Sequence, residues 1–383
     1  MSGKSFDFAV IGAGCFGAWC AYELLAAGYS VALLDAYGPA HSRASSGGES
    51  RIIRMGYGAD KLYTRWSLQA LARWHELSVR LPRPILHRTG MLWLSGSPEG
   101  HVRVTQQTLA RLGVPHETLS RAQLEDKFPQ ISSADIDWAL WEPDSGALMA
   151  RQAVQGLVAD AVARGLDYRL ARVAPPLPGR KLETVQLHDG SRLSAGAFVF
   201  ACGAWLPQLF PDLLASRIFP TRQEVYFFAT PPGDAAFAPP LMPAWFHHPA
   251  LVYGIPDLEC RGFKISIDRH GPAFDPDSGS RLPSAEGLAE ARAYLARRFP
   301  KLIDAPLTES RVCQYENTAN GDFILDRHPA IDNVVIAGGG SGHGFKHGPA
   351  VGDYVRCLLS STFVPEPRFA LAVKAQTQQR SVY

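Results

Sequence analysis

The sequence predicts an α/β fold whose first unit is a Rossmann-like nucleotide-binding domain. The observations that predict it lie together near the start of the chain: an apolar strand at 8–11, the motif Gly12-x-Gly14-x-x-Gly17 directly after it, an apolar helix-like run to about residue 27, and a second strand at 30–34 followed by Asp35. This order of strand, glycine turn, helix, strand and acid is typical of a dinucleotide-binding βαβ unit. The alternative is a glycine-rich turn that binds nothing.

Each residue of this motif has a physical role in binding a dinucleotide. Gly12 allows the tight turn, Gly14 lets the backbone approach a pyrophosphate, and Gly17 lets helix and strand pack closely. The helix N-terminus offers N–H groups and the positive end of the helix dipole to the phosphates. Asp35 follows Gly17 by 18 positions and can accept hydrogen bonds from ribose hydroxyls.

Composition excludes several classes of protein. The 383 residues leave room for two domains, and 38 basic against 36 acidic side chains give a net charge of +2. So small a charge implies no nucleic-acid partner. The apolar segment 8–34 could pass for a membrane span, but its glycines, Glu23 and Asp35 favour the dinucleotide fold. We therefore expect no membrane association and a cytoplasmic location. The six cysteines show no metal-site spacing, so we expect no metal.

The remaining elements follow along the chain. Residues 62–80 carry apolar side chains at helical spacing and predict an amphipathic helix. Similar patterns predict helices at 102–112, 120–127, 147–164, 284–298 and 349–359. Short apolar runs predict strands at 90–94, 170–173, 184–188, 198–202, 223–228, 252–255, 262–267 and 334–336. The proline-rich segments 174–178 and 231–243 are expected to be loops.

This pattern predicts a nucleotide domain that is interrupted twice by strand-rich insertions. The nucleotide domain would comprise 1–85, 147–215 and 316–383, and the substrate domain would comprise 86–146 and 216–315. Two interruptions suit a flavoprotein with a sheet above the flavin ring, whereas an NAD enzyme more often carries one substrate domain after the nucleotide unit. That comparison is an analogy at the level of the fold.

Several longer motifs carry a family resemblance along nearly the whole chain. They are SRIIRMGYG at 50–58, ACGAW at 201–205, GFK at 262–264, VCQYENTANGDFILDRHP at 312–329 and NVVIAGGGSGHGFKHGP at 333–349. With these motifs the sequence resembles the monomeric sarcosine oxidase and N-methyltryptophan oxidase family, flavin amine oxidases of the D-amino-acid-oxidase superfamily. The resemblance implies a Rossmann-like FAD-binding domain, a discontinuous mixed-sheet substrate domain and a monomer.

The resemblance also implies an active site. Arg51 would lie against the flavin ring, while Arg54 and Lys346 would hold a substrate carboxylate. An arginine fork matches a carboxylate through charge-assisted hydrogen bonds. Lys264 would stand across the ring as the oxygen-activating lysine, since a cation there stabilises superoxide. His343 would line the site. The alternatives are a surface ion pair for Arg54, a snorkelling lysine for Lys264 and a structural histidine for His343.

Cys313 matches the cysteine that forms a thioether to the flavin 8α-methyl group in this family. The alternative is a buried strand cysteine. Tyr315 and Tyr253 would frame the substrate pocket. The residues expected to bind the cofactor are Gly12, Gly14, Gly17, Asp35, Ser50, Arg51, Val173, Gly203, Trp205, Cys313, Gly340, Gly342, His343, Gly344, Phe345 and Lys346.

The chain departs from the sarcosine-specific members at the amine end of the pocket. Asp268 stands where those members carry a histidine, and the 45–50 loop reads SSGGES and keeps only the acid, Glu49. Asp268 could pair with a basic group of the substrate or only with Lys264. Residues 245–248 (WFHH) precede Tyr253, and we hypothesise that they build a larger, more aromatic pocket than sarcosine needs.

The sequence therefore predicts an FAD-dependent oxidase of a secondary or N-methyl amino acid. It would oxidise the C–N bond to an imine and reduce O2 to hydrogen peroxide, with the small amino acid and O2 as its partners. One alternative is a flavin dehydrogenase that passes electrons to another acceptor, against which Lys264 argues. A second alternative is a flavin-binding protein without turnover. A third is an NAD dehydrogenase, which would be colourless, whereas a flavoprotein would be yellow.

Overall fold

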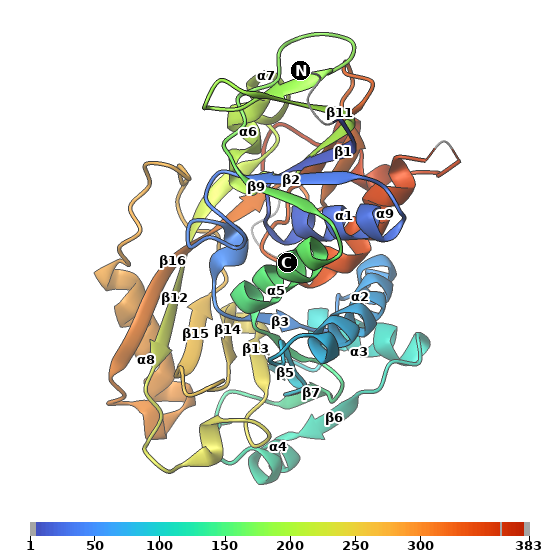
Figure 1. The fold of residues 1–383 in the computed structure, drawn as a ribbon. Coiled ribbons are helices and arrows are strands. Elements are labelled where there is room, and N and C mark those ends of the chain that lie inside the picture. Colours follow the sequence, from blue (N-terminus) through green and yellow to red (C-terminus); the bar gives the residue numbers. More distant parts are fainter. Residues whose placement is uncertain (1–4, 361, 379–383) are drawn as a thin grey trace.

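The structure is a computed structural model that describes residues 5–360 and 362–378. Two large sheets dominate it, a mainly parallel sheet above and a mainly antiparallel sheet below in Figure 1. Every helix within the described ranges is too short or too polar to cross a membrane. The mixed α/β architecture predicted from the sequence is confirmed.

The upper sheet has the strand order β17-β18-β11-β1-β2-β9, with β10 paired to β11. Its strands are β1 (Ser5–Ile11), β2 (Val31–Asp35), β9 (Asp167–Leu170), β10 (Thr184–Gln186), β11 (Arg192–Phe200), β17 (Ile324–Arg327) and β18 (Val334–Gly338). The pairs along β9-β2-β1-β11-β18 are parallel, whereas β10 and β17 pair antiparallel. The inner parallel strands β2 and β18 are apolar and almost completely buried, whereas the edge strand β9 is polar and partly exposed.

Glycine allows close packing of the helices that cover this sheet. They are α1 (Cys15–Ala26), α2 (Lys61–Arg80), α5 (Ala150–Ala163) and α9 (Gly348–Leu358), which meet around α1, with the short α6 (Leu206–Leu209) and α7 (Pro211–Leu214) after β11. A side chain at Gly17 would place its Cβ only 1.8 Å from the Gly12 carbonyl oxygen. Gly12 has φ +103°, which suits glycine. The tight turn predicted at Gly12 and the close packing predicted at Gly17 are therefore confirmed.

The lower sheet has the strand order β16-β12-β15-β14-β13-β5-β7-β6. Its strands are β5 (Met91–Ser95), β6 (Glu117–Ser120), β7 (Trp138–Glu142), β12 (Phe219–Phe228), β13 (Ala244–His247), β14 (Val252–Ile255), β15 (Phe263–Ile267) and β16 (Leu307–Asn317). Helices α3 (His101–Arg111), α4 (Arg121–Lys127) and α8 (Ala285–Arg298) belong to this part. A small sheet of β3 (Arg51–Ile53), β8 (Gly146–Leu148) and β4 (Leu86–His87) lies near the junction (Figure 1).

The sequence prediction was wrong at several boundaries; for example, β11 begins at Arg192 rather than at residue 198. The strand expected at 170–173 is β9 at Asp167–Leu170, since its pairing partner β2 ends at Asp35, and Val173 makes only an isolated bridge with Leu187. The helix expected from 147 begins at Ala150, because the preceding residues pair with β3 and β4 as strand β8. The strands β3, β4, β6, β7, β8, β13, β16 and β17 were not predicted.

Replacing Gly14 or Gly17 by alanine should change the free energy of unfolding by different amounts. We predict that Gly17→Ala lowers the free energy of unfolding by about 3 kcal/mol or more, because its Cβ would overlap backbone. Gly14→Ala should change it by less than about 1 kcal/mol, because its Cβ would meet only Ser46 Oγ at 3.4 Å. Chemical denaturation of both variants measures this. Equal losses would contradict the packing role of Gly17.

Candidate active site

A cavity of about 400 Å³ opens at the carboxyl ends of the parallel strands. Such an edge is where open α/β sheets bind ligands. Eleven of the residues predicted to bind the cofactor line it: Gly12, Gly14, Asp35, Arg51, Val173, Gly203, Trp205, Gly340, Gly342, Gly344 and Phe345. Gly17 instead lies within α1 and lets the helix pack closely against the Gly12 carbonyl. The cavity therefore gathers segments that are more than 300 residues apart in the chain.

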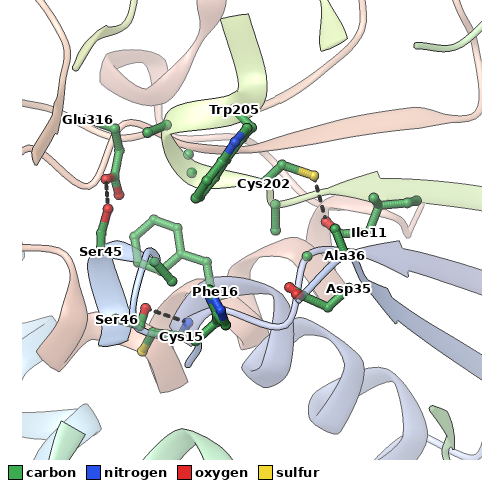
Figure 2. A pocket seen from close by; sticks show the side chains of 18 of the residues that line it. Ile11, Cys15, Phe16, Asp35, Ala36, Ser45, Ser46, Cys202, Trp205 and Glu316 are labelled. Atoms are coloured by element: carbon green, nitrogen blue, oxygen red, sulfur yellow. Dashed lines mark hydrogen bonds between the residues drawn. The ribbon is translucent and has the colours of Figure 1, made fainter. Parts of the chain in front are cut away.

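Asp35 is held in place by the backbone around it. Its Oδ2 accepts from Ala13 N at 2.7 Å, and its Oδ1 accepts from Tyr37 N at 2.8 Å and Gly38 N at 2.9 Å. A carboxylate offers about four acceptor positions, so capacity remains for a hydroxyl ligand. Figure 2 shows this carboxylate at the cavity beside Ala36. The geometry suits a ribose, as the sequence predicted.

The start of α1 suits a phosphate. Gly14 precedes the helix and leaves its Cα side open to the cavity, with only Ser46 Oγ within 4 Å of an added Cβ. The Cys15 N–H donates to Ser46 Oγ at 2.9 Å, and Phe16 and Trp205 project from opposite sides in Figure 2. The N–H groups and dipole at a helix start favour an anion. The sequence analysis did not identify Ser46, because it lies in a polar, glycine-containing loop that carries no more specific pattern.

A segment near the lower sheet closes over one end of this cavity. Asp277 Oδ1 accepts from Trp205 Nε1 at 3.0 Å and from Tyr37 OH at 3.3 Å, and Arg172 Nη2 lies 3.6 Å from the same oxygen. Burial opposes ionisation of Asp277, but these hydrogen bonds and Arg172 lower its pKa overall. All three partners line the cavity. This contact links the two predicted domains and was not foreseen from the sequence.

A half-buried acid, Glu316, forms part of the cavity wall at β16. Ser45 Oγ donates to Glu316 Oε2 at 2.5 Å (Figure 2). Burial raises the pKa of the Glu316 carboxyl above its usual range. An added Cβ on Gly340 would meet Glu316 Oε1 at 2.8 Å, so the glycine-rich loop passes directly over the acid. Neither Ser45 nor Glu316 was among the predicted site residues.

A second, smaller cavity of about 60 Å³ adjoins the first. The two share Arg51, Tyr315, Gly342 and Phe345 in their walls. The small cavity is also lined by Ile52, Arg54, Met91, Phe246, Tyr253, Asp268, His343 and Lys346. Both predicted carboxylate partners are therefore present, and both are buried, with 6% of Arg54 and 4% of Lys346 exposed.

The two cations are fixed by an aromatic and polar shell. The Arg54 guanidinium lies 4.4 Å from the ring centre of Tyr57 and 4.7 Å from that of Trp93, and it donates to the Gly56 carbonyl. Lys346 Nζ donates to Tyr57 OH at 2.7 Å and to the His343 carbonyl at 2.9 Å. Stacking on aromatic faces favours a cation in a dry site. Tyr57 thus connects both cations.

Two histidines complete this buried network. Tyr57 OH lies 2.8 Å from His347 Nε2 and 3.3 Å from His343 Nδ1, and His343 Nε2 lies 2.9 Å from the Gly321 carbonyl. Burial and the neighbouring Lys346 hold the pKa of His347 well below its usual range. These contacts anchor His343 structurally while one face of it lines the small cavity. Tyr57 and His347 were not predicted as site residues.

Ser50, Lys264 and Cys313 form a cluster around Arg51, outside the two cavity linings. Lys264 Nζ donates to the Ser50 carbonyl at 2.7 Å, and Arg51 donates to the same carbonyl at 2.8 Å. Arg51 Nη2 also contacts Cys313 Sγ at 3.2 Å. Burial, and next the charge of Arg51, lower the pKa of Lys264 well below its usual range.

Glu49 supports this cluster from outside. Its Oε1 lies 2.6 Å from Arg311, 3.2 Å from Arg151 and 3.3 Å from Arg261. Arg311 also pairs with Glu309, while Arg51 provides the contact to the Cys313 sulfur. The one acid retained in the 45–50 loop fixes that loop against β16 and α5.

The amine end of the small cavity contains a hydrogen-bonded acid. Tyr315 OH donates to Asp268 Oδ1 at 2.8 Å, whereas Lys264 is directed at Ser50. Asp268 thus contacts a tyrosine that lines the cavity. Tyr253 lines the same cavity, as predicted.

The hypothesis of a large aromatic pocket from 245–248 was wrong. Side chains alternate along β13, so Phe246 lines the small cavity while Trp245 packs on Tyr294 at 5.6 Å on the other face. His247 lies beside Arg298, and His248 stacks on His101 with ring centres 4.7 Å apart. The cavity is small and charged instead.

Comparisons with known proteins agree with this geometry. Residues 7–358 match the family model described as "DAO: FAD dependent oxidoreductase". The chain is 31% identical to a monomeric sarcosine oxidase of Bacillus sp. (strain NS-129), covering 93% of both chains. It is 32% identical to the peroxisomal sarcosine oxidase of Mus musculus, covering 91% of this chain and 90% of the relative. The L-proline dehydrogenase of P. horikoshii has a similar fold, with a TM-score of 0.85 at 20% identity over 96% of this chain and 97% of that chain.

Proposed function

This chain belongs to the family of FAD-dependent oxidoreductases described as DAO, and from that premise we propose that it is an oxidase of a small secondary or N-methyl amino acid. It would convert the C–N bond to an imine and reduce O2 to hydrogen peroxide. One observation carries this proposal. A small cavity containing Arg54 and Lys346 shares a wall with the large dinucleotide cavity, so a carboxylate held there would lie next to one end of the dinucleotide.

The large cavity fits FAD. The Gly12–Gly14 turn and the start of α1 would hold the pyrophosphate, and Asp35 would hold the ribose. The opposite end would reach the shared wall of Arg51, Tyr315, Gly342 and Phe345. When bound, FAD supplies the two-electron acceptor that the side chains of this protein lack.

The chain itself would position the substrate. Arg54 and Lys346 would bind the carboxylate, and Tyr57 would hold Lys346 in place. Apolar side chains from Ile52, Met91 and Phe246 would exclude water from the rest of the cavity. Its volume of about 60 Å³ favours a small amino acid over one with a large aromatic side chain.

We propose O2 as the electron acceptor, and the relatives' names as oxidases support this. Lys264 would assist the reaction with O2, although burial and the charge of Arg51 lower its pKa in the protein without cofactor. An anionic ring beside Lys264 would favour the charged amine again. The alternative is a dehydrogenase with another acceptor. We also propose the two-domain division given above, a monomer and a cytoplasmic location.

A direct experiment tests the function. Purified protein is mixed with sarcosine, proline or pipecolate in the absence of oxygen, and the yellow absorbance of the flavin is followed. Loss of that absorbance, with peroxide produced on adding air, is the expected result. Absence of reduction by every secondary and N-methyl amino acid tried would refute the proposal.

Arg54 should contribute mainly to substrate binding. Arg54→Ala removes charge-assisted hydrogen bonds worth about 2 kcal/mol, so KM should rise about 30-fold. Steady-state kinetics with the best substrate measure this. Arg180→Ala is the control, because that side chain is 89% exposed and pairs with Asp332 at the surface. An unchanged KM in Arg54→Ala would exclude the carboxylate role.

Cys313 should carry the flavin covalently. In wild-type protein the yellow colour should remain with the acid-precipitated pellet and the intact mass should include the cofactor, and Cys313→Ala should lose both. Cys202→Ala is the matched control, because Cys202 lines the cavity but burial raises the pKa of its thiol. If the Cys313→Ala protein keeps its flavin after acid treatment, the assignment is wrong.

Lys264 should act on the oxygen step alone. We predict that Lys264→Met slows reoxidation of the reduced flavin by O2 at least about 100-fold, while reduction by substrate changes much less. Stopped-flow traces of the two half-reactions separate these effects. Equal reoxidation rates in variant and wild type would remove the role given to Lys264 and favour the dehydrogenase alternative.

A further inference from the structure

Among the described residues that line the small cavity, Asp268 is the one carboxylate beside the cations. Asp268 follows β15 and is 7% exposed, and it shares the lining with Arg54 and Lys346. The acid comes from the lower sheet, whereas the two cations come from the segment after β3 and from the loop after β18. A buried carboxylate is costly unless it is paired or hydrogen-bonded, so the groups around Asp268 determine what it can bind.

Asp268 is held as a hydrogen-bond acceptor. Tyr315 OH donates to its Oδ1 at 2.8 Å, and its backbone N–H donates to the Leu251 carbonyl at 2.7 Å. Burial, and next the negative charge of Asp268, raise the pKa of Tyr315 well above its usual range, so the phenol keeps its proton and donates it. The carboxylate is thereby oriented in the wall that both cavities share through Tyr315.

The charges of this cavity match a zwitterion. Arg54 and Lys346 offer positive charge to a carboxylate, and Asp268 offers negative charge to an ammonium group. An amino acid in neutral water carries both groups at once. Interactions between such charges are strong in a site that excludes water. A zwitterion therefore complements charges of both signs in this cavity.

We propose that Asp268 binds the ammonium group of the substrate and accepts its proton, so that the protein takes up the zwitterion from solution. This inference rests on the proposed function. In the step, one N–H bond of the ammonium breaks and its electron pair stays on nitrogen as the lone pair. The proton forms an O–H bond with Asp268. No oxidant is needed, and the amine is then in the form from which a C=N bond can develop.

The titration of Asp268 depends on groups from several elements. The charged and titratable groups that face the small cavity with it are Tyr253, Tyr315, Arg51, Arg54, His343 and Lys346. His270 lies against Tyr315, with ring centroids 6.5 Å apart. Arg51, Arg54 and Lys346 place three cationic side chains in the same cavity as Asp268.

A pair of ligands with the same shape tests the binding step. Trimethylammonioacetate and 3,3-dimethylbutanoate share a carboxylate and a branched end, but only the first carries a cation. In calorimetry, the FAD-loaded wild-type protein should bind trimethylammonioacetate at least tenfold more tightly than 3,3-dimethylbutanoate. Asp268→Asn should reduce this preference to about twofold or less, and Asp268→Glu should retain it. Equal binding of both ligands by the wild type, or an unchanged preference in Asp268→Asn, would overturn the proposal.

A pH profile tests the proton transfer. In Asp268→Asn only the free amine reacts, so the second-order rate of flavin reduction should rise tenfold per pH unit up to the amine pKa. The wild type should be nearly flat over the same range, because Asp268 deprotonates the bound zwitterion. A tenfold rise per pH unit in the wild type would overturn the proposal, even if Asp268→Asn did not fold. If no secondary amino acid reduces the flavin but the cation preference depends on Asp268, the proposed function fails and the ammonium site stands.

Discussion

The structure depends on Arg51, whose guanidinium stands where the two cavities meet. It is held by the Ser45 and Ser50 carbonyls at 2.7 and 2.8 Å and contacts the Cys313 sulfur at 3.2 Å. Glu49 and its arginines brace the same loop from outside. One segment therefore positions part of the dinucleotide site and, directly after β3, the Arg54 side chain of the small cavity. The segment can serve both because its own backbone carbonyls hold the guanidinium.

Local rules predicted the part of the site that is local in sequence. Gly12, Gly17 and Asp35 act within one βαβ unit, and their packing and hydrogen bonds follow from the spacing. The family resemblance located Arg54 and Lys346. Glu316 and the Tyr57 network were missed because their partners lie about 270 to 290 residues away in the chain. Only the register of the lower sheet brings Tyr315 to Asp268.

The errors have equally physical causes. Trp245 and His247 were expected in the pocket as neighbours of Phe246, but strand alternation sends them to the opposite face of β13. The strand predicted at 170–173 moved because its register is fixed by β2. The chemistry that remains in the small cavity is buried charge of both signs, which is what a small amino acid carries.

The central claim is that the reacting end of the flavin lies at the wall shared by the two cavities. A crystal structure of the FAD-loaded protein with 3,3-dimethylbutanoate tests it most directly. The account predicts tricyclic density against Arg51, Tyr315, Gly342 and Phe345, with the ligand carboxylate at Arg54 and Lys346. A flavin ring elsewhere, or a carboxylate bound away from those two cations, would contradict it.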